Sequence, residues 1–138
     1  MSESTVQKSL VPPAASPLVY VVDEDEPVRD SFETLLPTAG YRAKTFATAD
    51  EFHSAWPECH KTDPPHCMVV CVELPDGDGR ELCKKVTTEK PNFPVVLMTR
   101  HDDQKLAANF TAFGACALLI RPFLPAELLE TLANLIGM

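Results

Sequence analysis

Short runs of apolar residues alternate along this chain with longer stretches in which apolar residues recur every three or four positions. The short runs are predicted as strands, and three of them are nearly continuous in apolar residues, as strands buried on both faces are. They span residues 18–22, 41–46, 67–72, 95–99 and 117–120. The sequence therefore predicts a parallel sheet.

Helical spacing fills the intervals between these strands. The first helix follows Pro27, a residue favoured in the first turn, and is expected to end at Gly40. Because Pro37 lacks a backbone donor, we expect fraying or an early end there. The second helix is predicted to begin after Thr48, its N-cap, and to end near Trp56, which is expected to be a packing anchor. The third is predicted over residues 79–89, and the fourth is predicted to stop at Gly114. Apolar positions of the last two helices are Leu106, Phe110 and Phe113, and Leu124, Leu128, Leu132 and Ile136.

Five strands that alternate with five helices indicate an α/β fold with a parallel sheet and helices on both faces. Residues 1–17 mix Ser, Thr, Pro and Ala without an apolar period, so a flexible leader is expected before a single domain over 18–138. In folds of this class, binding sites collect at the carboxyl ends of the strands.

Composition narrows the classes of function. The net charge of −8 argues against binding of nucleic acid, which depends on clustered Lys and Arg, so proteins are the expected partners. No apolar run approaches the roughly 20 residues that span a bilayer, and we expect a cytoplasmic protein. The five cysteines show no zinc-site spacing and are expected to be reduced, mostly as core residues.

Polar residues follow the predicted strands at one edge of the sheet. They are Asp23 and Glu24 after the first strand, Cys71 in the third, Thr99 at the end of the fourth and Arg121 after the fifth. Two acids, a hydroxyl and a cation suit a divalent metal and a phosphoryl group. A nucleophilic carboxylate is missing from this set.

The segments that hold these residues resemble the response-regulator receiver family, in the version found in nitrogen-fixation and LuxR-type regulators. They read VYVVDEDEPVRDSFETLLPTAGYRAKTFATADEF, MVVCVELPDGDG, LMTRHDD and GACALLIRPF, and the resemblance covers about residues 18–137. It implies a flavodoxin-like five-stranded parallel sheet of order 2-1-3-4-5. It also implies that Asp23 and Glu24 are the metal-binding acids and that Thr99 is the switch hydroxyl.

The same resemblance exposes departures around one pocket. Cys71 stands at the position of the phosphoacceptor aspartate, so neither an acyl phosphate nor a third metal carboxylate is available there. Arg121 replaces the usual lysine, Leu118 replaces the aromatic residue that changes position on activation, and Arg100 replaces a small residue.

Each of these residues has a plainer interpretation beside the functional one. Asp23 and Glu24 form either a weak Mg²⁺ site or a pair of solvated acids at the start of the first helix. Cys71 is interpreted as a packed thiol in preference to a redox group. Arg121 is either a surface ion-pairing residue or a planar fork that neutralises Glu24 or Asp23. Asp76 and Asp78 are interpreted as turn residues in PDGDG.

The sequence thus predicts a pseudo-receiver that acts through protein–protein contacts without phosphorylation, and not an enzyme. No cofactor is required, although weak Mg²⁺ binding is allowed. The expected partner is a signalling protein, an effector domain or a second copy of the chain, contacted through a surface that carries Lys105, Asn109 and Glu127. The alternative is a thiol-based or soft-metal sensor built on Cys71 with Asp23 and Glu24. Phosphorylation elsewhere, on Asp25 or Glu73, is a third option that no sequence feature favours.

Overall fold

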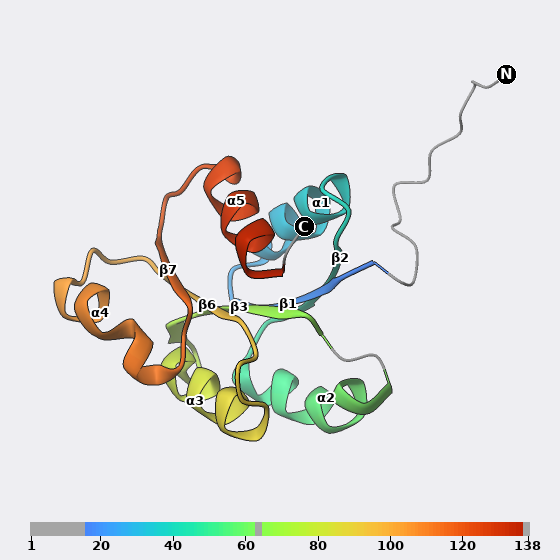
Figure 1. Ribbon diagram of the computed structural model, residues 1–138, viewed down its shortest axis with the longest axis horizontal. Helices are drawn as coiled ribbons and strands as arrows, with labels where there is room; N and C mark the ends of the chain where they lie inside the picture. The colour runs from blue at the N-terminus through green and yellow to red at the C-terminus, as the bar shows by residue number, and fades with distance from the viewer. Residues whose placement is uncertain (1–15, 63–64, 137–138) are drawn as a thin grey trace, which may run out of the picture.

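The computed structural model of the protein describes residues 16–62 and 65–136. Nearly all of the expected leader, residues 1–17, lies outside these residues. The central sheet has five parallel strands, namely β1 (Leu18–Val22), β2 (Arg42–Phe46), β3 (Cys67–Cys71), β6 (Val95–Thr99) and β7 (Ala117–Ile120). Their order across the sheet is β2-β1-β3-β6-β7 (Figure 1). Counted among themselves, the strands have the order 2-1-3-4-5, which confirms the flavodoxin-like prediction.

The helices cover both faces of this sheet. Helices α1 (Glu26–Thr38) and α5 (Pro125–Ile136) lie on one face, and α2 (Ala49–Thr62) and α3 (Gly79–Glu89) lie on the other (Figure 1). Helix α4 (Gln104–Asn109) lies beside the β7 end of the sheet. Every residue of β1, β3 and β6 is buried, as their continuous apolar runs predict. No helix in the described ranges has the length and apolar character to cross a membrane.

Aromatic rings fill the layer between the sheet and α2. Tyr20 of β1 is buried with its ring edge-on to Phe46, Phe52 and Trp56, with centroids 5.3, 6.4 and 6.3 Å away. Trp56 also stacks on Phe52 and donates from its indole N–H to Glu89 of α3 at 2.9 Å. The expected packing role of Trp56 is confirmed, but the helix does not end there, because α2 continues to Thr62.

Helix α1 passes through Pro37 and ends one residue later, so the expected early end is wrong. The last turn is closed by two backbone bonds, in which Gly40 N donates to Pro37 O and Tyr41 N to Leu36 O. Gly40 has a φ of 89°, which only glycine adopts readily. This closure satisfies carbonyls at the helix end, and the donor missing at Pro37 removes only one bond.

Two expectations for the carboxyl-terminal half are also corrected. The stretch from Leu106 to Phe113 is not one helix, because α4 stops at Asn109 and a 3₁₀ turn, η1 (Phe110–Phe113), follows. Asn109 leaves helical geometry with φ −135° and ψ 18°. Leu124 precedes α5 and is 66% exposed, whereas Leu128 and Leu132 are buried as predicted.

A two-stranded hairpin absent from the prediction follows β3. It pairs β4 (Glu73–Leu74) with β5 (Gly77–Asp78) in antiparallel register. Its turn residue Asp76 accepts bonds from the first N–H groups of α2, at Ala49 and Asp50, both at 2.9 Å. Asp78 caps α3 by accepting from Arg80 N at 2.8 Å. The two turn aspartates therefore also act as helix caps.

The hairpin returns the chain close to the end of β3. Gly79 N donates to Val72 O at 2.9 Å. A Cβ on Gly79 would lie 2.1 Å from Cys71 O, so only glycine fits at this position. The hairpin is thereby fixed beside the carboxyl edge of the sheet.

Candidate functional site

The residues that follow or end four neighbouring strands meet at the carboxyl edge of the sheet. Asp23 follows β1, Cys71 ends β3, Thr99 ends β6 and Arg121 follows β7. Backbone bonds continue the ladder past the strands, since Asp23 N donates to Phe46 O and Arg121 N to Thr99 O. The sheet therefore brings the residues singled out from the sequence into one pocket.

The centre of the pocket is an ion pair between Asp23 and Arg121. Asp23 is fully buried, and its Oδ2 accepts a hydrogen bond from Nη2 of Arg121, whose side chain is largely buried. Asp25 N donates to the other oxygen, Oδ1, at 2.9 Å. A buried carboxylate requires such partners. Arg121 therefore pairs with Asp23 through one guanidinium nitrogen, Nη2, and its interpretation as a surface residue is wrong, as is that of Asp23 as a solvated acid.

A second arginine lies over the acidic pair. Nη2 of Arg100 is 3.3 Å from Oε1 of Glu24 and 4.0 Å from Oδ1 of Asp23. Glu24 and Arg100 are both more than a third exposed, so this pair adds little stability. Its importance is electrostatic, because each of the two acids now has a guanidinium against it.

Cys71 lies under these groups as a neutral thiol. Nη2 of Arg121 donates to its Sγ at 3.2 Å, and Sγ donates to Oε1 of Glu73 at 3.6 Å. Burial, reinforced by the charge of Asp23, raises the pKa of Cys71 to about 11 despite the opposing effect of Arg121. Because the thiolate is the reactive form, this environment favours the packed thiol over the redox alternative.

Glu73 is the pocket residue that the sequence did not single out, except as an unfavoured phosphorylation site. Its Oε2 accepts from the Thr99 hydroxyl at 2.7 Å, and its Oε1 accepts from Arg100 N at 3.1 Å. Burial acts to raise the pKa of Glu73, but the hydrogen bonds from Thr99 and Arg100 outweigh it, so the pKa lies below its usual value. The available signal was its place two residues after Cys71, at the strand edge.

The two remaining expected residues differ in their relation to the pocket. Thr99 is buried, and besides its bond to Glu73 its hydroxyl accepts from His101 N at 3.2 Å. Leu118 lies in β7 in register with Leu97 and is packed against the core. Leu118 therefore has a packing role, whereas Thr99 is one of the polar contacts of the pocket.

These side chains do not fit Mg²⁺ well. Mg²⁺ prefers oxygen ligands in octahedral geometry, but Asp23 is held by Arg121, Glu24 faces Arg100 and Cys71 is a protonated thiol. Within the described ranges, no group of three or more His, Cys, Asp and Glu side chains is arranged to hold a metal ion. The pocket is better matched to permanent internal pairing than to a divalent cation.

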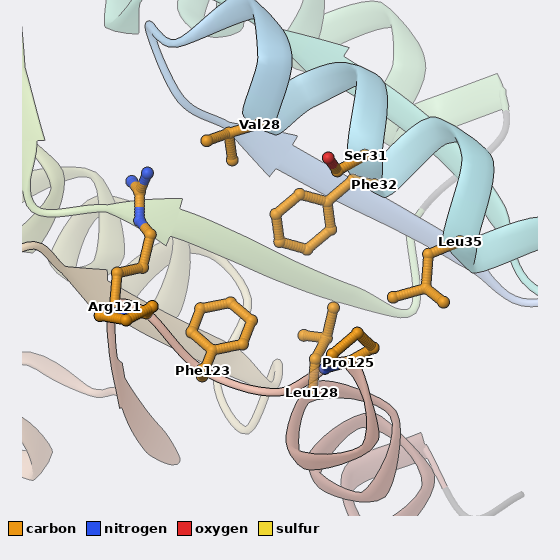
Figure 2. A pocket seen from close by; sticks show the side chains of 9 residues that line it. Val28, Ser31, Phe32, Leu35, Arg121, Phe123, Pro125 and Leu128 are labelled. Carbon is orange, nitrogen blue, oxygen red and sulfur yellow. The ribbon is translucent and has the colours of Figure 1, made fainter.

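An apolar cavity of about 290 Å³ adjoins the pocket between α1 and the start of α5. Arg121 stands at one end, and the rings of Phe32 and Phe123 extend from opposite walls (Figure 2). The other lining residues are Val28, Ser31, Leu35, Pro122, Pro125 and Leu128. Apart from Arg121 and Ser31 its walls are apolar, so the polar contacts of the site lie at the strand ends and not in this cavity.

A parallel α/β sheet with an acidic pocket at its carboxyl edge defines the flavodoxin-like class to which this protein belongs. The model of the response regulator receiver domain matches residues 19–133, and the chain is therefore a member of that family. It is a receiver domain of two-component signalling, a class of signalling modules.

Known relatives agree with this assignment. The transcriptional regulatory protein FixJ of Bradyrhizobium diazoefficiens is 36% identical over 105 residues, which are 76% of this chain and 49% of FixJ. The DNA-binding transcriptional regulator NtrC of Proteus hauseri is 31% identical over 115 residues, which are 83% of this chain and 23% of NtrC. The chain thus spans about half or less of the length of these regulators.

Solved structures show the same fold. Full-length FixJ from B. japonicum superimposes with a TM-score of 0.75 at 33% identity, over 88% of this chain and 58% of FixJ. A CheY-like receiver domain protein from Methanospirillum hungatei has a TM-score of 0.79 at 24% identity, over 89% of this chain and 95% of its own, a likeness of fold alone.

Proposed function

We propose that this receiver domain signals through protein–protein contacts without being phosphorylated in its pocket. The observation that carries the proposal is the thiol of Cys71 at the end of β3, bonded to Arg121 and next to Asp23. An acyl phosphate requires a carboxylate, and a thiol at this place does not supply one. The internal pairing of Asp23 with Arg121 also takes up an acid that a metal would need.

The same pairing supports weak Mg²⁺ binding at most. Two cations, Arg100 and Arg121, lie against the two acids, Asp23 and Glu24. A divalent cation would have to displace both guanidinium groups and would find no third carboxylate at position 71. The domain therefore requires no cofactor under this proposal.

The proposed contact surface is formed by α4, β7 and α5, and β7 is the edge strand of the sheet opposite β2. Its polar residues Lys105, Asn109 and Glu127 are exposed, and Leu124 adds an exposed apolar side chain. A surface of this mixed character suits a protein partner in the cytoplasm, either a signalling protein, an effector domain or a second copy of the chain. The net charge of the whole chain, −8, does not favour binding of nucleic acid.

Incubation with acetyl phosphate and Mg²⁺ tests the proposal. The intact mass of the protein should not change, because no carboxylate stands at position 71. The matched control is the double variant Cys71→Asp with Arg121→Lys, which restores the usual acceptor and lysine and should gain one phosphoryl group. A stoichiometric phosphoryl adduct on the unaltered protein, mapped to Asp25, Glu73 or any other pocket residue, would overturn the proposal.

A further inference from the structure

The end of β6 and the loop after it present hydrogen-bond donors to one point. The Thr99 hydroxyl and the backbone N–H of Arg100 both donate to the carboxylate of Glu73, at 2.7 and 3.1 Å. The Cys71 thiol donates to the same carboxylate at 3.6 Å. Donors from β3, β6 and the β6–α4 loop thus converge on one negative charge, which is the arrangement of an oxyanion-binding site.

Glu73 reaches this point from a backbone that has little freedom. It opens the β4–β5 hairpin and pairs with Asp78. The chain is fixed just beyond it, where Gly79 lies against Cys71 O. The carboxylate is therefore supplied at a defined position by the chain itself.

Arg100 connects the Glu73 carboxylate to Glu24, one of the two acids that follow β1. Glu73 holds the backbone of Arg100, and the side chain of the same residue reaches Glu24 at 3.3 Å. Thr99 in turn accepts from His101 N at 3.2 Å. One carboxylate thereby fixes the first residues of the loop that leads into α4.

We infer that Glu73 is a built-in occupant of an oxyanion site formed by Thr99 and the Arg100 amide, and that this site takes a small oxyanion such as inorganic phosphate when the Glu73 carboxylate is removed. The inference rests on the proposed function, since it names the internal group that occupies the pocket in place of a phosphoryl group. In the unaltered protein, the β6–α4 loop is held without any external ligand.

Glu73→Ala and the isosteric Glu73→Gln test this inference by amide hydrogen exchange and by titration with inorganic phosphate. Exchange at Arg100 and His101 should accelerate on the order of tenfold in Glu73→Ala, as expected when a hydrogen bond to a charged group is lost. Phosphate should reverse that change in Glu73→Ala and leave the unaltered protein unaffected. Glu73→Gln should fall between the two, because it keeps an acceptor oxygen but not the charge.

Glu33→Ala is the matched control, because Glu33 also accepts from a threonine hydroxyl, that of Thr45 at 2.8 Å, on an exposed surface. This variant should leave exchange at Arg100 unchanged with and without phosphate. Unchanged exchange in Glu73→Ala, or equal protection of the unaltered protein by phosphate, would overturn the inference. These exchange results test only the inference about Glu73. The proposed function is tested separately, by the intact mass after incubation with acetyl phosphate, so failure of one can be told from failure of the other.

Discussion

Nη2 of Arg121 donates a hydrogen bond to Oδ2 of Asp23 and so joins two residues that are 98 positions apart in the sequence. Asp23 is completely buried, and Arg121 is the only cation in direct hydrogen-bond contact with its carboxylate among the described residues. Removing one partner of such a pair leaves a buried, unpaired charge, and this destabilises the fold by much more than the intact pair stabilises it. The predictions below begin from this pair.

Mg²⁺ should bind the unaltered protein with a Kd above about 1 mM, as expected for a carboxylate pair without a third anionic ligand. Arg121→Met removes the competing cation and should tighten binding, while Arg42→Met, at the opposite edge of the sheet, should not. Amide shifts of Asp23 and Glu24 in an NMR titration measure both. Submillimolar saturable binding by the unaltered protein would show that the guanidinium does not block the acids.

The cysteines of the described residues should react with a thiol reagent in a fixed order. Cys116 is exposed, whereas burial raises the pKa of Cys67 to about 12, of Cys71 to about 11 and of Cys83 to about 12. At neutral pH Cys116 should therefore be modified first, as followed by peptide mass mapping. Modification of Cys71 as fast as that of Cys116 would favour the thiol sensor instead.

The same raised pKa values predict how the free energy of unfolding changes as the pH becomes alkaline. A thiol whose folded pKa is raised stabilises the folded state fully below its ordinary pKa of 9.0. For Cys71 this contribution should be lost as the pH rises from about 9 through about 11. Cys71→Ser should show a smaller decline over that interval in urea unfolding, and an identical decline would mean that other groups dominate.

Gly79→Ala should destabilise the protein by about 2–3 kcal/mol, because the new methyl group would overlap the carbonyl oxygen of Cys71. Gly77→Ala is the matched control in the same hairpin. Its Cβ would meet only Ala49 Cβ at 3.6 Å, and a change within about 0.5 kcal/mol is expected. Urea unfolding midpoints compare the two, and equal midpoints would contradict the close approach at Gly79.

The unaltered protein should populate one dominant conformation of its contact surface. A modification shifts a two-state protein only by its differential stabilisation of one state, and the usual modification is absent here. Relaxation dispersion at Lys105, Asn109 and Glu127 should be flat in the unaltered protein. Exchange should appear in the Cys71→Asp, Arg121→Lys variant and respond to a phosphoryl mimic; exchange already present without these changes would contradict the prediction.

Much of the fold follows from local sequence. The strand limits agree with the prediction within one residue, because buried parallel strands are continuous apolar runs. The order of the strands came from the resemblance, since periodicity does not encode it. The break at Asn109 escaped prediction because Leu106, Phe110 and Phe113 keep helical spacing across it.

The site was predicted as a set of positions and not as a network. Strand ends placed Asp23, Cys71, Thr99 and Arg121 at one edge, but the choice between Asp23 and Glu24 as the partner of Arg121 depends on side-chain direction. Glu73 was missed because its contacts arise from a hairpin whose two strands have only two residues each, which is too short to leave a pattern in the sequence. Both the partner of Arg121 and the contacts of Glu73 depend on side-chain positions in three dimensions, which the spacing of residues along the chain does not give.

The brevity of α4 sets the dynamics of the proposed contact surface. A helix of six residues has little stability of its own, and this one depends on its Asp103 cap, on buried Leu106 and on the loop before it. Its amide hydrogens should therefore exchange with solvent through a rare local opening that leaves the central sheet intact and is too sparsely populated to appear in relaxation dispersion. Helix α4 is therefore a part of the proposed contact surface that can unfold separately from the sheet, and a bound partner protein would stabilise it.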